Sequence, residues 1–182
     1  MLIREVTDVI ERFAPLAWQE SYDNAGLIVG RPDDEVHRAL LAVDVTDEVM
    51  AEAEREGCDM VITHHPIVFH ALKRFNSADQ VQRCVERAIR GGIALYACHT
   101  NLDSAPGGMS WRLAEMLGVG DLRVLQPAQA DEKVGFGVVG ELPEPMATVE
   151  FMRRMQRVLG VRVVRHSDIA SPEVRRVAVC TG

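Results

Sequence analysis

Continuous apolar runs and helically spaced apolar residues alternate along the first two thirds of the chain. The runs at residues 37–46, 58–63 and 92–100 have the length of buried strands. Between and around them, apolar residues recur every three or four positions, which predicts helices over residues 3–14, 47–57, 79–92 and 107–118. This alternation predicts an α/β layered fold with a largely parallel sheet flanked by helices.

The pattern changes from about residue 122. Short apolar segments here indicate strands, separated by one amphipathic helix over residues 148–160. The predicted strands span residues 122–127, 132–142, 161–166 and 174–182. We therefore expect an N-terminal α/β lobe over residues 1–126, followed by a connecting β/α segment and a further strand over residues 127–182.

Composition narrows the possible partners and the location. The net charge of −7 argues against bulk binding to nucleic acid or to an anionic membrane, although it leaves a single nucleotide acceptable as a substrate. No apolar run reaches the length of a membrane span, and the first residues lack a signal-peptide core, so we expect a cytoplasmic protein. The four cysteines are widely spaced, which predicts reduced and mostly buried thiols.

Histidines gather at the ends of two predicted strands. The adjacent pair His64 and His65 ends one strand, His99 ends the next, and Asp103 follows four residues later. Ligands of parallel sheets bind at the carboxyl ends of the strands. Neighbouring side chains of a regular strand point to opposite faces, so both histidines reach one cavity only if the backbone turns there. Pro66 favours such an exit from the strand.

Two metal ions would explain this pair better than one. Each ion would take one imidazole, and the two oxygens of Asp103 would bridge the ions. His99 would be a further ligand, a hydrogen-bonding partner of a ligand, or an acid/base. Mixed imidazole and carboxylate ligands suit zinc, iron, manganese or nickel without choosing among them.

Simpler structural roles compete with these assignments. A histidine at a strand end can merely cap a loop, and Asp44 can serve only to cap the following helix. Asp23 and Asn24 either shape a turn before Gly26 or form the rim of a site. Surface or helix-starting roles are expected for the remaining candidates, namely His37, His70, His166 and the pair Gly107 and Gly108.

Several segments together resemble one known family. The segments DNAGLIVG, DMVITHHPIVF, HTNLDSAPGG and VGFGVVGELPEP occur in this order, followed by RRVAVCTG. They resemble the NIF-three-like family, the dinuclear-metal-centre hexameric proteins, whose members are often described as type 2 homologues of GTP cyclohydrolase I. The resemblance implies a two-lobed subunit in a toroidal hexamer, with two divalent metals in a cleft between the lobes. It also implies that His64, His65 and Asp103 are metal ligands and that His99 lines the site.

The chain departs from the family pattern in one respect. Family members continue beyond the segment VAVCTG into a second lobe, where a His and a Glu four residues apart complete the metal site. His166 is the only histidine after Asp103, and Glu173 has the wrong spacing. We therefore expect an incomplete second lobe in this chain, with weak metal binding because water would fill the open coordination positions.

These observations give three functional hypotheses. The first is a dinuclear-metal-dependent hydrolase of the cyclohydrolase kind, in which a metal-activated water attacks a nucleotide or related heterocycle and His99 shuttles a proton. The second is a non-catalytic regulatory or scaffold protein that binds metal and forms a ring-shaped homo-oligomer. The third is an inactive fragment of a longer functional protein.

Overall fold

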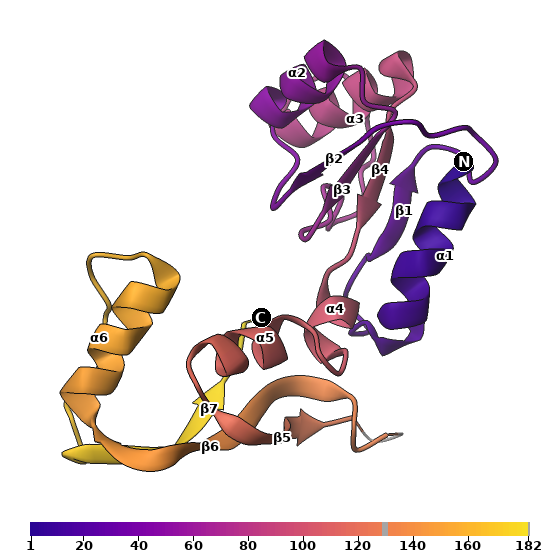
Figure 1. Cartoon of the computed structure of the whole chain (residues 1–182). Helices are drawn as coiled ribbons and strands as arrows, with labels where there is room; N and C mark the ends of the chain where they lie inside the picture. Colours follow the sequence, from indigo (N-terminus) through magenta and orange to yellow (C-terminus); the bar gives the residue numbers. More distant parts are fainter. Residues whose placement is uncertain (129–130, 182) are drawn as a thin grey trace. The chain divides into compact units, whose positions relative to one another are not determined.

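The computed structural model of the chain describes residues 1–128 and 131–181 (Figure 1). The chain divides into two compact units, Met1–Leu102 and Asp103–Gly182, and each is described here by itself. The boundary expected after residue 126 falls within the strand Gly120–Pro127 of the second unit, and this division into domains stays a prediction. Gly182, the last residue of the final predicted strand, lies outside the described residues. In the described part of the chain, no helix is long and apolar enough to cross a membrane.

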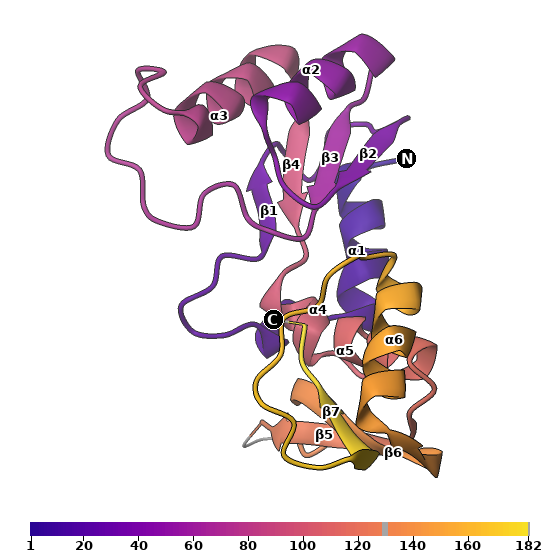
Figure 2. The same ribbon diagram turned by 90° about the vertical axis from the view of Figure 1, so that its left-hand side faces the viewer.

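The first unit is built on a mostly parallel sheet of four strands, as the sequence predicts. Its strands are β1 (Gly26–Val29), β2 (Ala39–Ala42), β3 (Met60–Thr63) and β4 (Ala94–Ala97), in the spatial order β1-β4-β3-β2. The pairs β2–β3 and β3–β4 are parallel, whereas β1 joins the edge antiparallel to β4. Because β3 and β4 are central and parallel, their carboxyl ends lie side by side (Figure 2).

Helices cover both faces of this sheet. The helices α2 (Asp47–Glu56) and α3 (Gln80–Gly91) lie on one face, and α1 (Ile3–Phe13) lies on the other (Figures 1 and 2). The Tyr96 hydroxyl of β4 donates a hydrogen bond to Glu11 of α1 at 3.3 Å. The core beneath α2 and α3 is aliphatic and sulfur-rich, and its buried members include Met50, Ala53, Val61, Cys84, Ala88 and Leu95.

The cap of α2 corrects one expectation from the sequence. The side chain of Thr46 accepts a hydrogen bond from the backbone N–H of Val49 at 3.2 Å, so Thr46 is the N-cap residue. The suggested capping role of Asp44 was wrong, because its carboxylate is directed to His65 instead. Gly57 ends the helix in the left-handed region with φ of 64°, as the stop signal in the sequence predicts.

The second unit is a three-stranded antiparallel sheet with two main helices. Its strands β5 (Gly120–Pro127), β6 (Gly135–Ala147) and β7 (Glu173–Val179) pair in the order β5-β6-β7. The helices α5 (Met109–Met116) and α6 (Thr148–Leu159) contribute Ala114 and Phe151 to its core. Gly108 precedes α5 as its N-cap residue, which confirms the helix-starting role predicted for the glycine pair.

One predicted strand does not form. Residues 161–166 have no regular secondary structure, although Val161 and Val163 alternate as in a strand. The available edge of β6 is paired with β7 from Glu173 onward, so this segment has no strand beside it. Val163 is consequently 79% exposed. Alternation alone predicts which residues can share a face, but a strand also needs a neighbouring edge to satisfy its backbone groups.

Candidate metal centre

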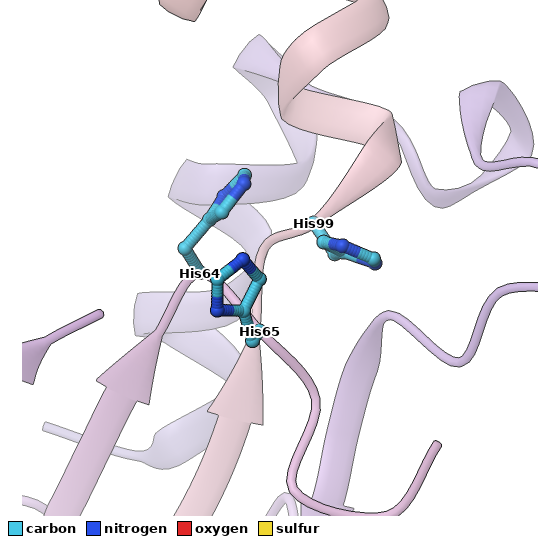
Figure 3. A group of neighbouring side chains, drawn as sticks. All are labelled: His64, His65 and His99. Carbon is cyan, nitrogen blue, oxygen red and sulfur yellow. The ribbon is translucent and has the colours of Figure 1, made fainter. Parts of the chain in front are cut away.

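The three histidines singled out in the sequence come together at the carboxyl ends of β3 and β4 (Figure 3). One ring nitrogen from each of His64, His65 and His99 lies within 4.8 Å of the others. The ring centroids are 4.9 Å apart for His64 and His65, 5.2 Å for His64 and His99, and 5.5 Å for His65 and His99. This is the spacing at which imidazoles can share bound ions.

The backbone turns at the end of β3, as the adjacent pair requires. Thr63 is the last residue of the strand, and its hydroxyl donates a hydrogen bond to the carbonyl oxygen of His65 at 2.9 Å. The backbone N–H of His65 in turn donates to the carbonyl of Val43, which follows β2, at 3.1 Å. These two bonds fold the chain back on itself. Both imidazoles thereby reach the same side of the sheet, although they are consecutive in the sequence.

An oxygen atom faces the Nδ1 of every imidazole in the cluster. Nδ1 of His64 lies 2.9 Å from the carbonyl oxygen of Cys98. Nδ1 of His65 lies 2.7 Å from Asp44, and Nδ1 of His99 lies 2.7 Å from Asp23. Because a carbonyl or an ionised carboxylate only accepts hydrogen bonds, these partners assign the proton of each neutral ring to Nδ1. The lone pair then resides on Nε2, which is the arrangement that metal-binding histidines use.

Asp23 is the best-anchored of these oxygen partners. Its side chain is fully buried, and it accepts hydrogen bonds from Nδ1 of His99 and from the backbone N–H and hydroxyl of Thr100. Burial by itself would raise the pKa of Asp23, but the hydrogen bonds from His99, Thr100 and Asn24 outweigh burial and hold the pKa below its ordinary value. Asp23 is therefore a carboxylate at neutral pH, and it lies beside the histidine cluster.

The partner of His65 is more open to solvent. The side chain of Asp44 is 57% exposed, and that of His65 is 50% exposed, whereas the side chain of His99 is 17% exposed. The two carboxylate–histidine pairs thus differ in their contact with water. His65 is therefore in contact with water, whereas His99 lies in a drier setting.

Asp103, the predicted bridging ligand, belongs to the second unit. It lies in α4 (Thr100–Ser104), its side chain is buried, and its Oδ1 accepts a hydrogen bond from the hydroxyl of Thr181 at 3.3 Å. That hydroxyl also lies 2.9 Å from the hydroxyl of Ser110. Its role as a metal ligand stays a prediction, as do those of His64 and His65, and so does the catalytic role of His99.

The remaining histidines are not members of the cluster, and of the cysteines only Cys98 contacts it, through its carbonyl oxygen. His37 lies 3.8 Å from Glu35 and 3.6 Å from Asp59 at an exposed position, and His166 is exposed in the second unit. His70 is exposed next to Phe69. Three of the cysteines are buried, Cys180 is exposed, and no disulfide joins any of the four, all of which the structure describes. The prediction of mostly buried thiols is confirmed.

Comparison with known proteins supports the resemblance drawn from the sequence. The family model of Duf34/NIF3 (NGG1p interacting factor 3) matches residues 1–182. A relative from Clostridium perfringens named GTP cyclohydrolase 1 type 2 homolog is 31% identical over 182 residues, which cover 100% of this chain and 70% of the relative. A relative of the same name from Streptomyces coelicolor is 35% identical over 187 residues, covering 99% of this chain and 65% of the relative.

A solved structure shows the same fold. The crystal structure of a Bacillus cereus protein related to NIF3 superposes with a TM-score of 0.89 at 22% sequence identity, covering 98% of this chain and 76% of that protein. At this level of sequence identity the match is evidence for the fold alone. The chain spans about two thirds of the length of the first two relatives described above.

Proposed function

Because the chain belongs to the Duf34/NIF3 family, we propose that it is a dinuclear-metal-dependent hydrolase of the GTP cyclohydrolase 1 type 2 kind, acting on a nucleotide or a related heterocycle. The observation that carries this proposal is the convergence of the His64, His65 and His99 imidazoles, each with an oxygen partner at Nδ1. This donor set suits divalent zinc, iron, manganese or nickel. Such ions, when bound, would supply the Lewis acidity that makes water a nucleophile at neutral pH.

In this proposal each residue has a role that follows from its surroundings. His64 and His65 would hold ions through Nε2, because their Nδ1 atoms face the oxygen atoms of Cys98 and Asp44. Asp103 would supply a carboxylate ligand. Hydrolytic opening of a ring requires that one proton leave the attacking water and that one proton reach the departing nitrogen.

His99 is suited to both proton transfers. Its Nε2 can take a proton from water and return it to the ring nitrogen. The imidazolium that forms in between is stabilised by the buried carboxylate of Asp23, 2.7 Å from Nδ1. The limited exposure of the His99 side chain, 17%, keeps this pair of groups out of bulk water and strengthens their interaction.

Metal binding and turnover of GTP by the same set of variants test this proposal. His64→Ala and Asp103→Ala are expected to lose both metal and turnover, while His99→Ala is expected to keep most of its metal and lose turnover. His37→Ala, an exposed histidine of the same unit, is the matched control and should behave like the unaltered protein. Unchanged turnover in His64→Ala and Asp103→Ala, with folding intact, would end the hydrolase proposal. Normal metal content without turnover would favour the metal-binding scaffold.

A further inference from the structure

An exposed pair of aromatic rings stands beside the histidine cluster. The rings of Tyr22 and Phe69 lie 6.4 Å apart at an interplanar angle of 62°, and the two residues are 62% and 40% exposed. The ring of Phe69 lies 6.2 Å from that of His99, nearly perpendicular to it. Only 5% of the residues are aromatic, so two exposed neighbours at this place form a distinctive surface.

Such a pair is suited to hold a flat ring. Aromatic rings pack with centroids about 4.5–7 Å apart, either offset-stacked or edge to face. The centroid of a ligand ring packed on Phe69 would therefore lie about as far from the Phe69 centroid as the centroid of the His99 ring does. Such a ring would bury exposed apolar surface of Phe69 and Tyr22 on the side of His99.

The segment that carries Phe69 is locally basic in an acidic protein. The net charge of the chain is −7, yet residues 60–78 contain no Asp or Glu. Lys73 and Arg74 are exposed in this segment, and neither forms an ion pair with any residue that the structure describes. They line a surface hollow of about 550 Å³ together with Ala71, Leu72 and Gln82.

The basic residues are close enough to Phe69 to serve one ligand. Lys73 follows Phe69 by four positions, so their Cα atoms are at most roughly 14 Å apart even in a fully extended chain. The long side chains of Lys73 and Arg74 can shorten the remaining gap. One molecule with a flat ring at one end and a negative group at the other can therefore contact both parts.

We infer that Tyr22, Phe69, Lys73 and Arg74 form the substrate-binding site of the proposed metal centre, and that its ligand is a mononucleotide. The base packs on Phe69 and Tyr22 beside His99, and the phosphates contact Lys73 and Arg74. The reaction at the ring of the ligand rests on the proposed function. The binding of the ligand does not. The acidic net charge makes a nucleic-acid strand an unsuitable occupant, because a strand requires a continuous basic surface.

Calorimetric titration with three probes separates the two halves of the site. GTP contains base and phosphates, guanosine contains only the base, and inorganic tripolyphosphate contains only the phosphates. Phe69→Ala is expected to weaken GTP and guanosine about 5- to 150-fold and to leave tripolyphosphate unchanged. Lys73→Gln and Arg74→Gln are each expected to weaken GTP and tripolyphosphate about 2- to 5-fold, with an effect that shrinks at high salt, and to leave guanosine unchanged.

Three further variants guard against trivial explanations. Phe69→Leu keeps an apolar side chain but removes the flat ring, so it should bind GTP as weakly as Phe69→Ala. Phe13→Ala and Arg12→Gln change an exposed phenylalanine and an exposed arginine of α1 and should leave all three affinities unchanged. Equal losses in the control and site variants would overturn the inference, and so would unaltered GTP binding in Phe69→Ala or no binding of any probe.

The same titrations, made with metal-free and metal-loaded protein, keep this inference separate from the proposed function. Binding of GTP with the expected pattern by a protein that takes up no metal would support the substrate site and refute the metal centre. Uptake of metal without any binding of GTP would refute the substrate site and leave the metal centre standing.

Discussion

The buried carboxylate of Asp23 accepts a hydrogen bond from Nδ1 of His99 at 2.7 Å, although the two residues are 76 positions apart in the sequence. The same carboxylate accepts the backbone N–H of Thr100 at 3.1 Å. It therefore joins the loop before β1 to the end of β4 and fixes the orientation of one imidazole. This contact is therefore expected to affect both the stability of the first unit and the chemistry that we propose for its histidines.

Replacing Asp23 by Asn should destabilise the fold and disturb His99. The Asn side chain has the same size but no charge. It has one acceptor oxygen, whereas the Asp23 carboxylate has two that accept these hydrogen bonds. We expect a loss of about 1–3 kcal/mol in the free energy of unfolding, measured by urea denaturation. Nitrogen NMR of the His99 ring should show a smaller population with the proton on Nδ1. Asp8→Asn, an exposed change on α1, is the control, and equal effects of the two variants would refute this role.

Replacing Asp44 by Asn should weaken metal binding without harming the fold. Asp44 is exposed and accepts from Nδ1 of His65, so it orients a proposed ligand. Loss of such a partner typically lowers metal affinity about 10- to 100-fold. Titration with Zn²⁺ measures this, and Glu48→Gln at the exposed start of α2 is the matched control. Equal zinc affinity in Asp44→Asn and the unaltered protein would show that Asp44 does not support a ligand.

The cap of α2 gives a prediction that involves no metal. Thr46→Ala should lower the free energy of unfolding by about 0.5–2 kcal/mol, because the backbone N–H of Val49 loses its acceptor. Thr46→Ser keeps that acceptor and should restore most of the loss. Asp44→Ala should change stability by less than about 0.5 kcal/mol, as expected for a surface position. A larger loss in Asp44→Ala than in Thr46→Ala would restore the capping role first expected for Asp44.

Stability should decline in alkaline solution because of Cys84. Burial first, and the charge of Asp47 next, raise the pKa of the Cys84 thiol from 9.0 to about 11. Between these values the unfolded chain loses a proton that the folded chain keeps, so stability is complete below pH 9 and is lost as pH rises toward 11. Burial also raises the pKa of Tyr96, which acts in the same direction.

Urea unfolding at pH 8, 9 and 10 measures this decline. Cys84→Ala removes the titrating group, so the stability of this variant should fall less steeply with pH than that of the unaltered protein. The absolute stability of the variant will be lower because a buried side chain has been shortened. An identical slope in both proteins would show that Cys84 does not cause the alkaline loss.

The sequence predicts the fold where local patterns and tertiary contacts agree. The apolar runs of β3 and β4 and the stripe of α3 were readable because each occupies the buried face that its period implies. Residues 161–166 show the limit of this reasoning, since this valine-rich segment has no strand edge beside it. The edge strand β1 was not predicted either, because its four residues in the segment DNAGLIVG are too few for a clear period.

The candidate site was predictable in part for a similar reason. His64, His65 and His99 follow apolar strands directly, so the rule about strand ends finds them. Asp44 and Asp23 act on two of these rings across 21 and 76 residues, respectively, and a local pattern cannot assign them. Tyr22 and Phe69 were missed as well. The absence of acidic residues from 60 to 78 in an acidic chain is the signal that would have pointed to their surroundings.

The metal content of the purified protein tests the central claim most directly. Elemental analysis together with native mass spectrometry, after equilibration with Zn²⁺ or Mn²⁺, gives the number of ions per chain. We predict two weakly held ions per chain in the unaltered protein and in His37→Ala, and a clear loss in His64→Ala, His65→Ala and Asp103→Ala. A metal content in the unaltered protein no higher than in His64→Ala, with both proteins folded, would contradict the account.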